Sequence, residues 1–345
     1  MAYSTIEKSS SYRSTSLFTG NGATKAVTGV GFQPDLCWVK NRSAGFDHQL
    51  FDVLRGVTYR ISINNNSAQT QQSSSFTAFG ADGFTVANYD PTNQLNAASA
   101  VWNWKAGGTG VSNTDGSVTS TVSANTTSGF SVCTWTGTGS VLTVGHGLGA
   151  VPKSFIVKRL DSTGDGVVYH EKMGNAGGME ITSTGGYNAT SGWFNDTSPT
   201  SSVFTLGTNG NINASGGSYV AWCFAEVGGY SKFGEYIGDG NTNGTFIYTG
   251  FKPSWVMVKN QASGNHYMMY DTKIIPYNLG DKLNRANDSA AEVTSASGEM
   301  YDFLSNGFKA RAVSNNNTNY AGSTYCYWAF GQPIISNSGV CATAR

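Results

Sequence analysis

Three landmarks recur in the same order three times along the 345-residue chain. Internal repetition is the sequence feature that most constrains the fold, because each copy must adopt the same structure. The first landmark is an aromatic residue followed by a Gly-rich turn. Its copies are Phe18-Thr19-Gly20-Asn21-Gly22, Trp135-Thr136-Gly137-Thr138-Gly139 and Tyr236-Ile237-Gly238-Asp239-Gly240.

The second landmark is an apolar run that starts at a Pro, 14 or 15 residues after the first Gly of the turn. A Val stands five residues after the Pro and a Lys six residues after it. Since the run is almost wholly apolar, we expect a strand buried on both faces. The three copies span residues 31–41, 149–159 and 250–260 and contain the aromatic residues Trp38, Phe155 and Trp255.

The third landmark is an aromatic strand that closes the unit, at residues 99–104, 219–224 and 325–330. Trp102, Trp222 and Trp328 align within it. We expect these tryptophans and the aromatic residues of the second landmark to fill the core between the two sheets of each unit.

These landmarks divide the chain into repeat 1 at residues 12–106, repeat 2 at 129–227 and repeat 3 at 229–331. Residues 107–128 are either a linker or an edge strand laid across a neighbour. The short second junction predicts close packing of repeats 2 and 3, and residues 332–345 are interpreted as a C-terminal arm.

The composition favours strands and tight turns. The chain has 44 Gly and 12% charged residues, and its polar part is dominated by Gly, Ser, Thr and Asn, which are poor helix formers. The best helix candidate runs from Asn278 to Glu292, and Gly280 weakens it. We therefore predict an all-β protein of three tandem β-sandwich or jelly-roll-like repeats.

Charge and cysteine content bear on the partners and the compartment. The 21 basic and 21 acidic residues balance, and there is no basic stripe, which argues against nucleic-acid binding. Near-zero charge favours self-association. No run approaches the ~20 apolar residues of a membrane span, and no signal peptide is evident, so membrane insertion is not expected. Five scattered cysteines without a CxxC pair indicate small buried hydrophobes in a chain made in a reducing cytoplasm.

Several motifs invite a cofactor but are better explained as turns. Residues 29–31 and 145–149 are Gly-rich but are followed by a Pro and a strand, not by the helix of a dinucleotide site. Residues 239–244 match half of a calcium loop, but Gly250 stands where the bidentate Glu is required. Residues 161–166 are interpreted in the same way, and no cofactor is predicted.

The histidines are interpreted as structural. His48, His170 and His266 fall at similar places in their repeats, near Asp52, Glu171 and Asp271 respectively, and His146 is the fourth. A His beside a carboxylate can act as a base, but one active site need not recur three times. We expect His–carboxylate hydrogen bonds that fix strands or loops, and no catalytic residue is predicted.

The best candidate for ligand contact is Trp193-Phe194, which lies in a Gly-, Ser- and Asn-rich context in repeat 2. Exposed aromatic rings can stack on sugars, whereas buried ones fill a sandwich core. Both alternatives stay open for this pair, with the core the more common outcome.

The repeats also resemble a known domain. The segments 250–259, 219–225 and 302–308, the linker 119–130 and the ending 342–345 are similar to a repeated domain found in virion proteins of tailed phages. That family has no assigned catalytic residues. The resemblance implies a non-enzymatic virion structural protein of the tail-fibre or receptor-binding type. A capsid-decorating (cement) protein and a stand-alone carbohydrate-binding lectin module are the alternatives.

The implied partners are other virion proteins, further copies of the chain as a trimer or symmetric lattice, and a host surface glycan.

Overall fold

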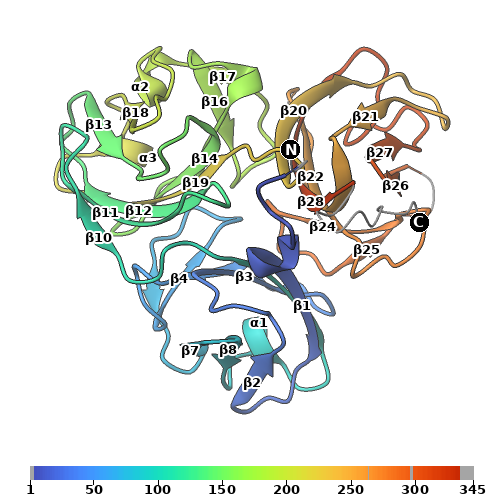
Figure 1. Cartoon of the computed structure of the whole chain (residues 1–345), viewed down its shortest axis with the longest axis horizontal. Helices are drawn as coiled ribbons and strands as arrows, with labels where there is room; N and C mark the ends of the chain where they lie inside the picture. The colour runs from blue at the N-terminus through green and yellow to red at the C-terminus, as the bar shows by residue number, and fades with distance from the viewer. Residues whose placement is uncertain (1–3, 263, 296–297, 335–345) are drawn as a thin grey trace.

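The computed structural model describes residues 4–262, 264–295 and 298–334, and the predicted all-β fold is confirmed. Figure 1 shows three strand-built lobes around a common centre, one for each repeat. Each lobe pairs one large antiparallel sheet with one small sheet, as in a β-sandwich. No helix in the described part of the chain is long and apolar enough to cross a membrane.

In repeat 1 the large sheet has the strand order β1-β9-β3-β4-β5-β6, and the small sheet has the order β2-β8-β7. A short 3₁₀ turn, η1 (Ser9–Ser11), precedes the first strand, and one helical turn, α1 (Asp90–Asn93), precedes the last. The strands are β1 (Arg13–Thr19), β2 (Lys25–Thr28), β3 (Leu36–Asn41), β4 (Gln49–Asp52), β5 (Tyr59–Ser62), β6 (Thr70–Gln71), β7 (Phe76–Gly80), β8 (Gly83–Val86) and β9 (Ala98–Trp104).

In repeat 2 the large sheet has the order β10-β11-β12-β19-β14-β15-β16-β17, and the small sheet is β13-β18. Its last six strands correspond to the large sheet of repeat 1. The elements are β10 (Val111–Asn113), β11 (Ser120–Asn125), β12 (Phe130–Thr136), β13 (Leu142–Gly145), β14 (Pro152–Arg159), β15 (Val167–His170), η2 (Glu171–Met173), β16 (Gly177–Glu180), β17 (Asn188–Ala189), α2 (Ser191–Phe194), β18 (Val203–Leu206), α3 (Gly210–Asn213) and β19 (Ser218–Ala225).

In repeat 3 the same order returns as β20-β28-β22-β23-β24-β25, with a small sheet β21-β27-β26. The strands are β20 (Ser231–Ile237), β21 (Phe246–Tyr248), β22 (Phe251–Asn260), β23 (Tyr267–Asp271), β24 (Lys282–Arg285), β25 (Val293–Thr294), β26 (Tyr301–Leu304), β27 (Gly307–Ala310) and β28 (Thr324–Pro333).

The second and third landmarks form neighbouring strands in every repeat: β3 with β9, β14 with β19, and β22 with β28. Every residue of β3 is buried, as expected for an apolar strand covered on both faces. Pro152 is the first residue of β14, whereas Pro253 lies within β22 where the pairing register shifts. Both are places where a missing N–H does little harm.

Residues 107–128 contain the two extra strands of repeat 2. β11 pairs with β12 and β10 pairs with β11, so this segment extends the large sheet. Of the C-terminal arm, Gln332 and Pro333 belong to β28, and residues 335–345 lie outside the described residues.

The helix expected from Asn278 to Glu292 does not form. Residues 282–285 are strand β24, which pairs with β23 and with β25. Leu283 is buried at 1% exposure within this strand. The apolar spacing that suggested a helix was irregular, and pairing with an existing sheet edge outweighed the weak local preference.

The aligned tryptophans do not fill the core between the two sheets of each repeat, so that prediction was wrong. Trp102, Trp222 and Trp328 lie on the opposite face of the large sheets, in a core that all three repeats share. Trp38 and Trp255 lie there too. Phe155 alone among the predicted core residues packs inside its own sandwich.

Two of the sandwiches have their own separate cores. The core of repeat 1 contains Val39, Phe51 and Phe84, and that of repeat 2 contains Phe155, Trp193 and Phe204. The apolar interior of repeat 3 is continuous with the shared core. Strands buried on both faces thus join two apolar regions, one within a repeat and one between repeats.

Candidate functional site

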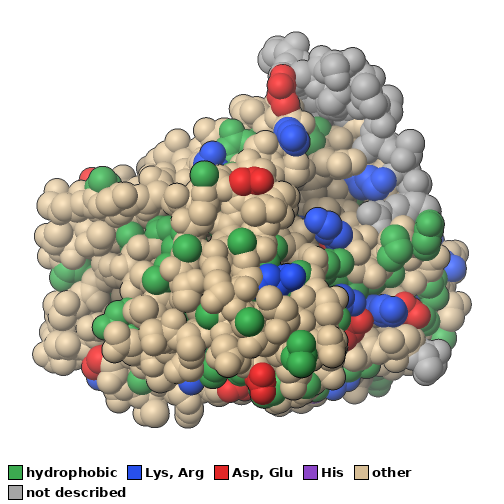
Figure 2. Space-filling model, turned by 90° about the horizontal axis from the view of Figure 1, so that it is seen from below, with side chains coloured by type: hydrophobic (Ala, Val, Ile, Leu, Met, Phe, Trp, Pro, Cys, Tyr) green, Lys and Arg blue, Asp and Glu red, His purple; other side chains and the backbone are tan. Residues whose placement is uncertain are grey.

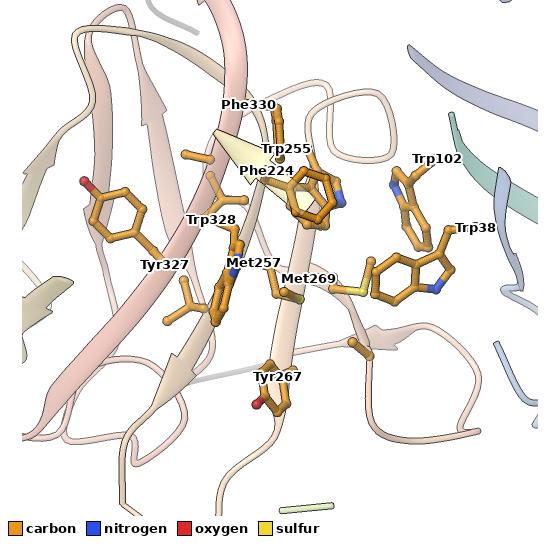
Figure 3. Close-up of a cluster of buried hydrophobic side chains, with 14 of the residues drawn as sticks. Trp38, Trp102, Phe224, Trp255, Met257, Tyr267, Met269, Tyr327, Trp328 and Phe330 are labelled. Atoms are coloured by element: carbon orange, nitrogen blue, oxygen red, sulfur yellow. The ribbon is translucent and has the colours of Figure 1, made fainter. Parts of the chain in front are cut away.

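The shared core is built where the large sheets of the three repeats meet. Figure 3 shows Trp38 and Trp102 of repeat 1, Phe224 of repeat 2, and Trp255 and Phe330 of repeat 3 converging on one space. An apolar cavity of about 20 Å³ remains at their centre. This is space for about one water molecule, so the centre is a packed core and no ligand chamber.

Each aligned tryptophan reaches across a junction to the next repeat around the ring. The indole N–H of Trp102 donates to Asp271 Oδ2 of repeat 3 at 3.1 Å. The indole N–H of Trp328 donates to Ser154 Oγ of repeat 2 at 2.8 Å. The guanidinium carbon of Arg55 in repeat 1 lies 5.9 Å from the ring centre of Trp222. The tryptophans therefore tie the repeats together.

Three equivalent loops also connect neighbouring repeats, by hydrogen bonds. Each follows the fifth core strand of its repeat and spans residues 63–69, 181–187 or 286–292. In the first loop, the carbonyl of Asn66 accepts a hydrogen bond from the backbone N–H of Gly164 in repeat 2, at 2.8 Å. In the second loop, the carbonyl of Thr184 accepts a hydrogen bond from the backbone N–H of Gly264 in repeat 3, at 2.9 Å. The third loop contacts repeat 1, because the carbonyl of Ser289 accepts a hydrogen bond from Lys40. Repeat 1 therefore contacts both other repeats.

Two of the three aligned lysines of the second landmark bind carbonyl groups of these loops. The ammonium of Lys158 donates to Asn65 O at 2.9 Å, and that of Lys40 donates to Ser289 O at 2.7 Å. Lys259 donates to the carbonyl of Asn260, 2.9 Å away within its own repeat. Burial lowers the pKa of each of the three ammonium groups to about 8.

The junction between repeats 1 and 3 is the most charged. The Asp271 carboxylate is 2% exposed and accepts hydrogen bonds from Arg13 at 3.0 Å and Thr15 at 2.5 Å, besides that from Trp102. Burial lowers the pKa of the Arg13 guanidinium, and Asp271 opposes that shift. Arg42 forms a second ion pair with Glu292 at 2.6 Å. These charges lock one repeat to another.

The histidines serve structure but do not bind carboxylates, so the expected His–carboxylate hydrogen bonds were wrong. His48, His146 and His170 each accept an N–H at Nδ1 and face a backbone carbonyl with Nε2. This pattern fixes the neutral tautomer with the proton on Nε2. His266 instead contacts Asn287 Oδ1 at 3.3 Å. Burial is the largest cause of a lowered pKa for all four.

The suspected cofactor motifs are turns. Asp239 accepts the backbone N–H of Asn241 at 3.0 Å, and Asn243 Oδ1 already accepts from Lys309 at 2.7 Å. Gly29 and Gly31 have positive φ and direct their N–H groups to Asp82. Among the described residues, no three His, Cys, Asp or Glu side chains gather as metal ligands would.

The proposed glycan contact at Trp193 and Phe194 is corrected by their burial. The two side chains are 2% and 1% exposed in the core of repeat 2. Phe194 packs edge-on against Phe155 at 5.4 Å. A sugar cannot stack on a ring whose faces are covered, so the pair fills the sandwich, as the alternative interpretation held.

Three surface grooves lie at the three junctions, at equivalent places around the ring. The groove between repeats 1 and 3 runs beside β1 and is lined by Arg13, Asp271 and Lys273. That between repeats 1 and 2 is lined by Leu54, Phe79 and the linker residue Gly110. The third runs beside β20, between repeats 2 and 3.

The groove beside β20 has a volume of about 410 Å³ and combines aromatic with charged side chains. Phe246 and Tyr248 of β21 are 44% and 52% exposed. The ammonium of Lys232 lies 5.3 Å from the ring centre of Tyr248. The carboxylates of Glu226 and Glu235 also line it. We call it the β20 groove and regard it as the best candidate for contact with another molecule.

The sequence analysis missed this groove, although comparing the repeats could have found it. The register of the small sheets places Phe246 and Tyr248 where repeat 1 has Ala26 and Thr28. Two exposed aromatic residues in place of small ones are a signal of contact. In the view from below, by contrast, most of the surface is backbone and other side chains, with small separate apolar spots and with charged side chains more numerous on the right (Figure 2).

The fold and the junctions define an all-β protein of three sandwich repeats closed into a ring. A family model described as "Domain of unknown function (DUF7483)" matches residues 8–333, and the chain belongs to this family. The match takes in all three repeats. No curated protein and no solved structure matched the chain.

Proposed function

We propose that this protein is a non-enzymatic structural component of a tailed-phage virion, displayed on the particle surface as a tail-fibre or receptor-binding element. The observation that carries the proposal is the position of four buried charged or titratable groups. Lys40, Lys158, Asp271 and His170 all make contacts across the junctions between repeats. Such groups would be the working parts of an active site, and here they join one repeat to the next.

Two further features support the proposal. The repeats resemble the domain found in phage virion proteins, and the ring is held by one continuous core with contacts at every junction. A strand-built body with zero net charge and one continuous core suits a part that must survive outside the cell. Equivalent repeats also match the symmetric contacts of a particle lattice.

The test is to purify intact particles by density gradient and quantify the protein by mass spectrometry, using the major capsid protein as the internal standard. We expect a fixed, symmetry-related copy number, and labelled particles imaged by electron microscopy should carry the label on the tail. Recovery only from infected-cell lysate, with none on washed particles, would exclude the proposal.

Capsid decoration is the second candidate, and the approximate threefold arrangement of the repeats favours it. A pseudo-threefold molecule can sit on a threefold position of a shell with all its repeats in contact. In that case the label lies on the capsid, and removing the protein lowers the heat stability of particles without altering host range. A lectin module acting alone has lost its candidate residues, because Trp193 and Phe194 are buried.

A further inference from the structure

The β20 groove follows a strand edge that another repeat keeps covered. In repeat 2, the equivalent edge strand β12 pairs with β11 in antiparallel register, with Val122 opposite Cys133. Val122 is 2% exposed and belongs to the sandwich core. Ser120 Oγ donates to Gly145 O at 2.8 Å. β11 therefore shows which kind of strand pairs with the edge of β12, and β20 has the equivalent edge in repeat 3.

In repeat 3 no such strand is present in the described part of the chain. β20 pairs with β28 on one side. Its outer backbone groups make two hydrogen bonds to side chains instead: Glu226 accepts the N–H of Phe233 at 3.3 Å, and Thr245 donates to Ile237 O at 2.8 Å. The turn η2 of repeat 2 forms the opposite wall of the groove, with Glu171 and Lys172 in the lining. An edge strand with free backbone groups beside an open groove is a ready site for pairing with another strand.

The chain carries a second segment with the pattern of β11. Ser120, Val122 and Ala124 face the sandwich as Ser-x-Val-x-Ala, and the same pattern recurs at Ser338-Gly339-Val340-Cys341-Ala342. Residues 335–345, here called the C-terminal segment, have one basic residue, Arg345, and no acidic one. In the β20 groove the acidic residues outnumber the basic ones, with Glu171, Glu226 and Glu235 against Lys172 and Lys232. In the groove beside β1 the basic residues outnumber the acidic one, with Arg13 and Lys273 against Asp271. Charge therefore favours the β20 groove.

We propose that the C-terminal segment of one copy adds as a strand to β20 of a second copy, in the register of β11 on β12. Main-chain hydrogen bonds provide the affinity in this mode of recognition, and alternate side chains provide the specificity. Val340 then lies opposite Gly234 and Gly339 opposite Glu235, as Val122 lies opposite Cys133 and Thr121 opposite Thr134. Val340 and Ala342 cover Phe246 and Tyr248.

The donor must be a second copy because the chain cannot reach its own groove in this register. Phe330 pairs with Ser231, so Pro333 lies three residues beyond the start of β20, while Ser338 belongs opposite Tyr236. These points are separated by eight residues of strand, or ~27 Å. The five residues from Pro333 to Ser338 span at most ~18 Å. This mode of joining copies goes beyond the proposed function and does not depend on it.

The first experiment is disulfide trapping in the full chain. Two chains, each also carrying Cys341→Ser, receive either Glu235→Cys or Gly339→Cys, and the two are mixed under mild oxidation. The four described native cysteines are buried and stay silent. We expect a cross-linked dimer in the mixture. The matched control replaces Gly339→Cys by Ser338→Cys, whose side chain faces the opposite side of the strand, and should give at least tenfold less.

The second experiment compares the full chain with one ending at residue 334 by sedimentation velocity. The full chain should gain mass with concentration, the shortened chain should not, and a peptide of residues 335–345 should bind the shortened chain. The same peptide with Val340→Asp should bind at least tenfold more weakly. Equal association of both chains, absence of peptide binding, or cross-linking only within a chain carrying both cysteines would each overturn the proposal.

Discussion

Asp271 shows how much of this molecule depends on single buried side chains. Its carboxylate receives hydrogen bonds from Arg13, Thr15 and Trp102, all from repeat 1, although it belongs to β23 in repeat 3. A buried ion pair is of uncertain net value, but removing one partner leaves the other charge uncompensated in an apolar setting. A change of one atom at the junction between repeats 1 and 3 should therefore strongly lower the free energy of unfolding.

Asp271→Asn should lower the free energy of unfolding by about 3 to 5 kcal/mol, because it leaves the buried Arg13 guanidinium without its counter-charge. Urea unfolding followed by tryptophan fluorescence measures this. The matched control is Asp302→Asn, which breaks a partly exposed ion pair with Arg311 and should change stability by less than about 1 kcal/mol. Equal effects of the two variants would contradict the argument.

His170 predicts a pH dependence of stability. Burial lowers its pKa to about 4, whereas in the unfolded chain it takes up a proton near pH 6.5. The unfolded state therefore binds more protons between these values, and stability falls as pH drops from about 6.5 towards 4. His170→Gln removes this contribution.

The free energies of unfolding of the native chain and of His170→Gln should be compared at pH 7, 6 and 5. The difference between them should shift against the native chain as pH falls. A difference that stays constant over this range would show that His170 is protonated in the folded state as readily as in the unfolded one.

Among the elements, β11 is the piece that repeats 1 and 3 lack in the described structure. It covers the edge of β12 and inserts Val122 into the core of repeat 2. A covered edge cannot pair with another chain, so the linker both connects two repeats and closes one of them. The edges of β1 and β20 have no such strand among the described residues.

Val122→Ala should lower the free energy of unfolding by about 2 kcal/mol, since it removes buried apolar surface and leaves a void. Thr121→Ala, on the exposed face of the same strand, should change it by less than about 0.5 kcal/mol. Chemical denaturation measures both. Similar small effects would mean that β11 does not contribute to the core.

At the scale of elements, the sequence predicted where the strands lie, but it did not predict which face of each strand packs against which neighbour. The Pro-to-Lys run and the Trp-containing run became neighbouring strands in all three repeats. A strand that is apolar on both faces has no polar face to show which side meets which neighbour. The placement of Trp102, Trp222 and Trp328 between repeats was for that reason beyond sequence reasoning, whereas the burial of Trp193 was the outcome that the sequence favoured.

The site residues were predicted less well because they come from different repeats. The lysines of the second landmark were visible as a recurring Lys. For Lys158 and Lys40, however, the carbonyls that they bind belong to loops of other repeats, 93 and 249 residues away in the sequence, and for Lys259 the carbonyl belongs to its own repeat. Predicting the β20 groove would have required a comparison of β21 with β2. Only the relative placement of the repeats brings these groups together.

The whole molecule should unfold as one unit, because the shared core contains side chains from all three repeats. Trp222→Ala in the shared core and Trp135→Ala in the core of repeat 2 should each lower the free energy of unfolding by about 3 to 5 kcal/mol. Both should shift one common transition, seen alike by calorimetry, circular dichroism and fluorescence.

Repeat 2 expressed alone, as residues 107–227, is the complementary test. It exposes Ile156, Trp222 and Phe224, which the other repeats otherwise cover, and we expect it to aggregate or remain unfolded. A soluble, cooperatively folding repeat 2, or separate melting transitions in the full chain, would show that the repeats are independent domains.

The direction in which the loops reach has a consequence for synthesis in the cell. Loop 63–69 contacts repeat 2 and loop 181–187 contacts repeat 3, but loop 286–292 returns to repeat 1. At about 5–20 residues per second, a ribosome takes roughly 10 to 50 s to finish the chain after repeat 1 has emerged. During that interval Trp38 and Trp102 have no lasting cover, so the nascent chain should be a strong client of chaperones that shield apolar surface.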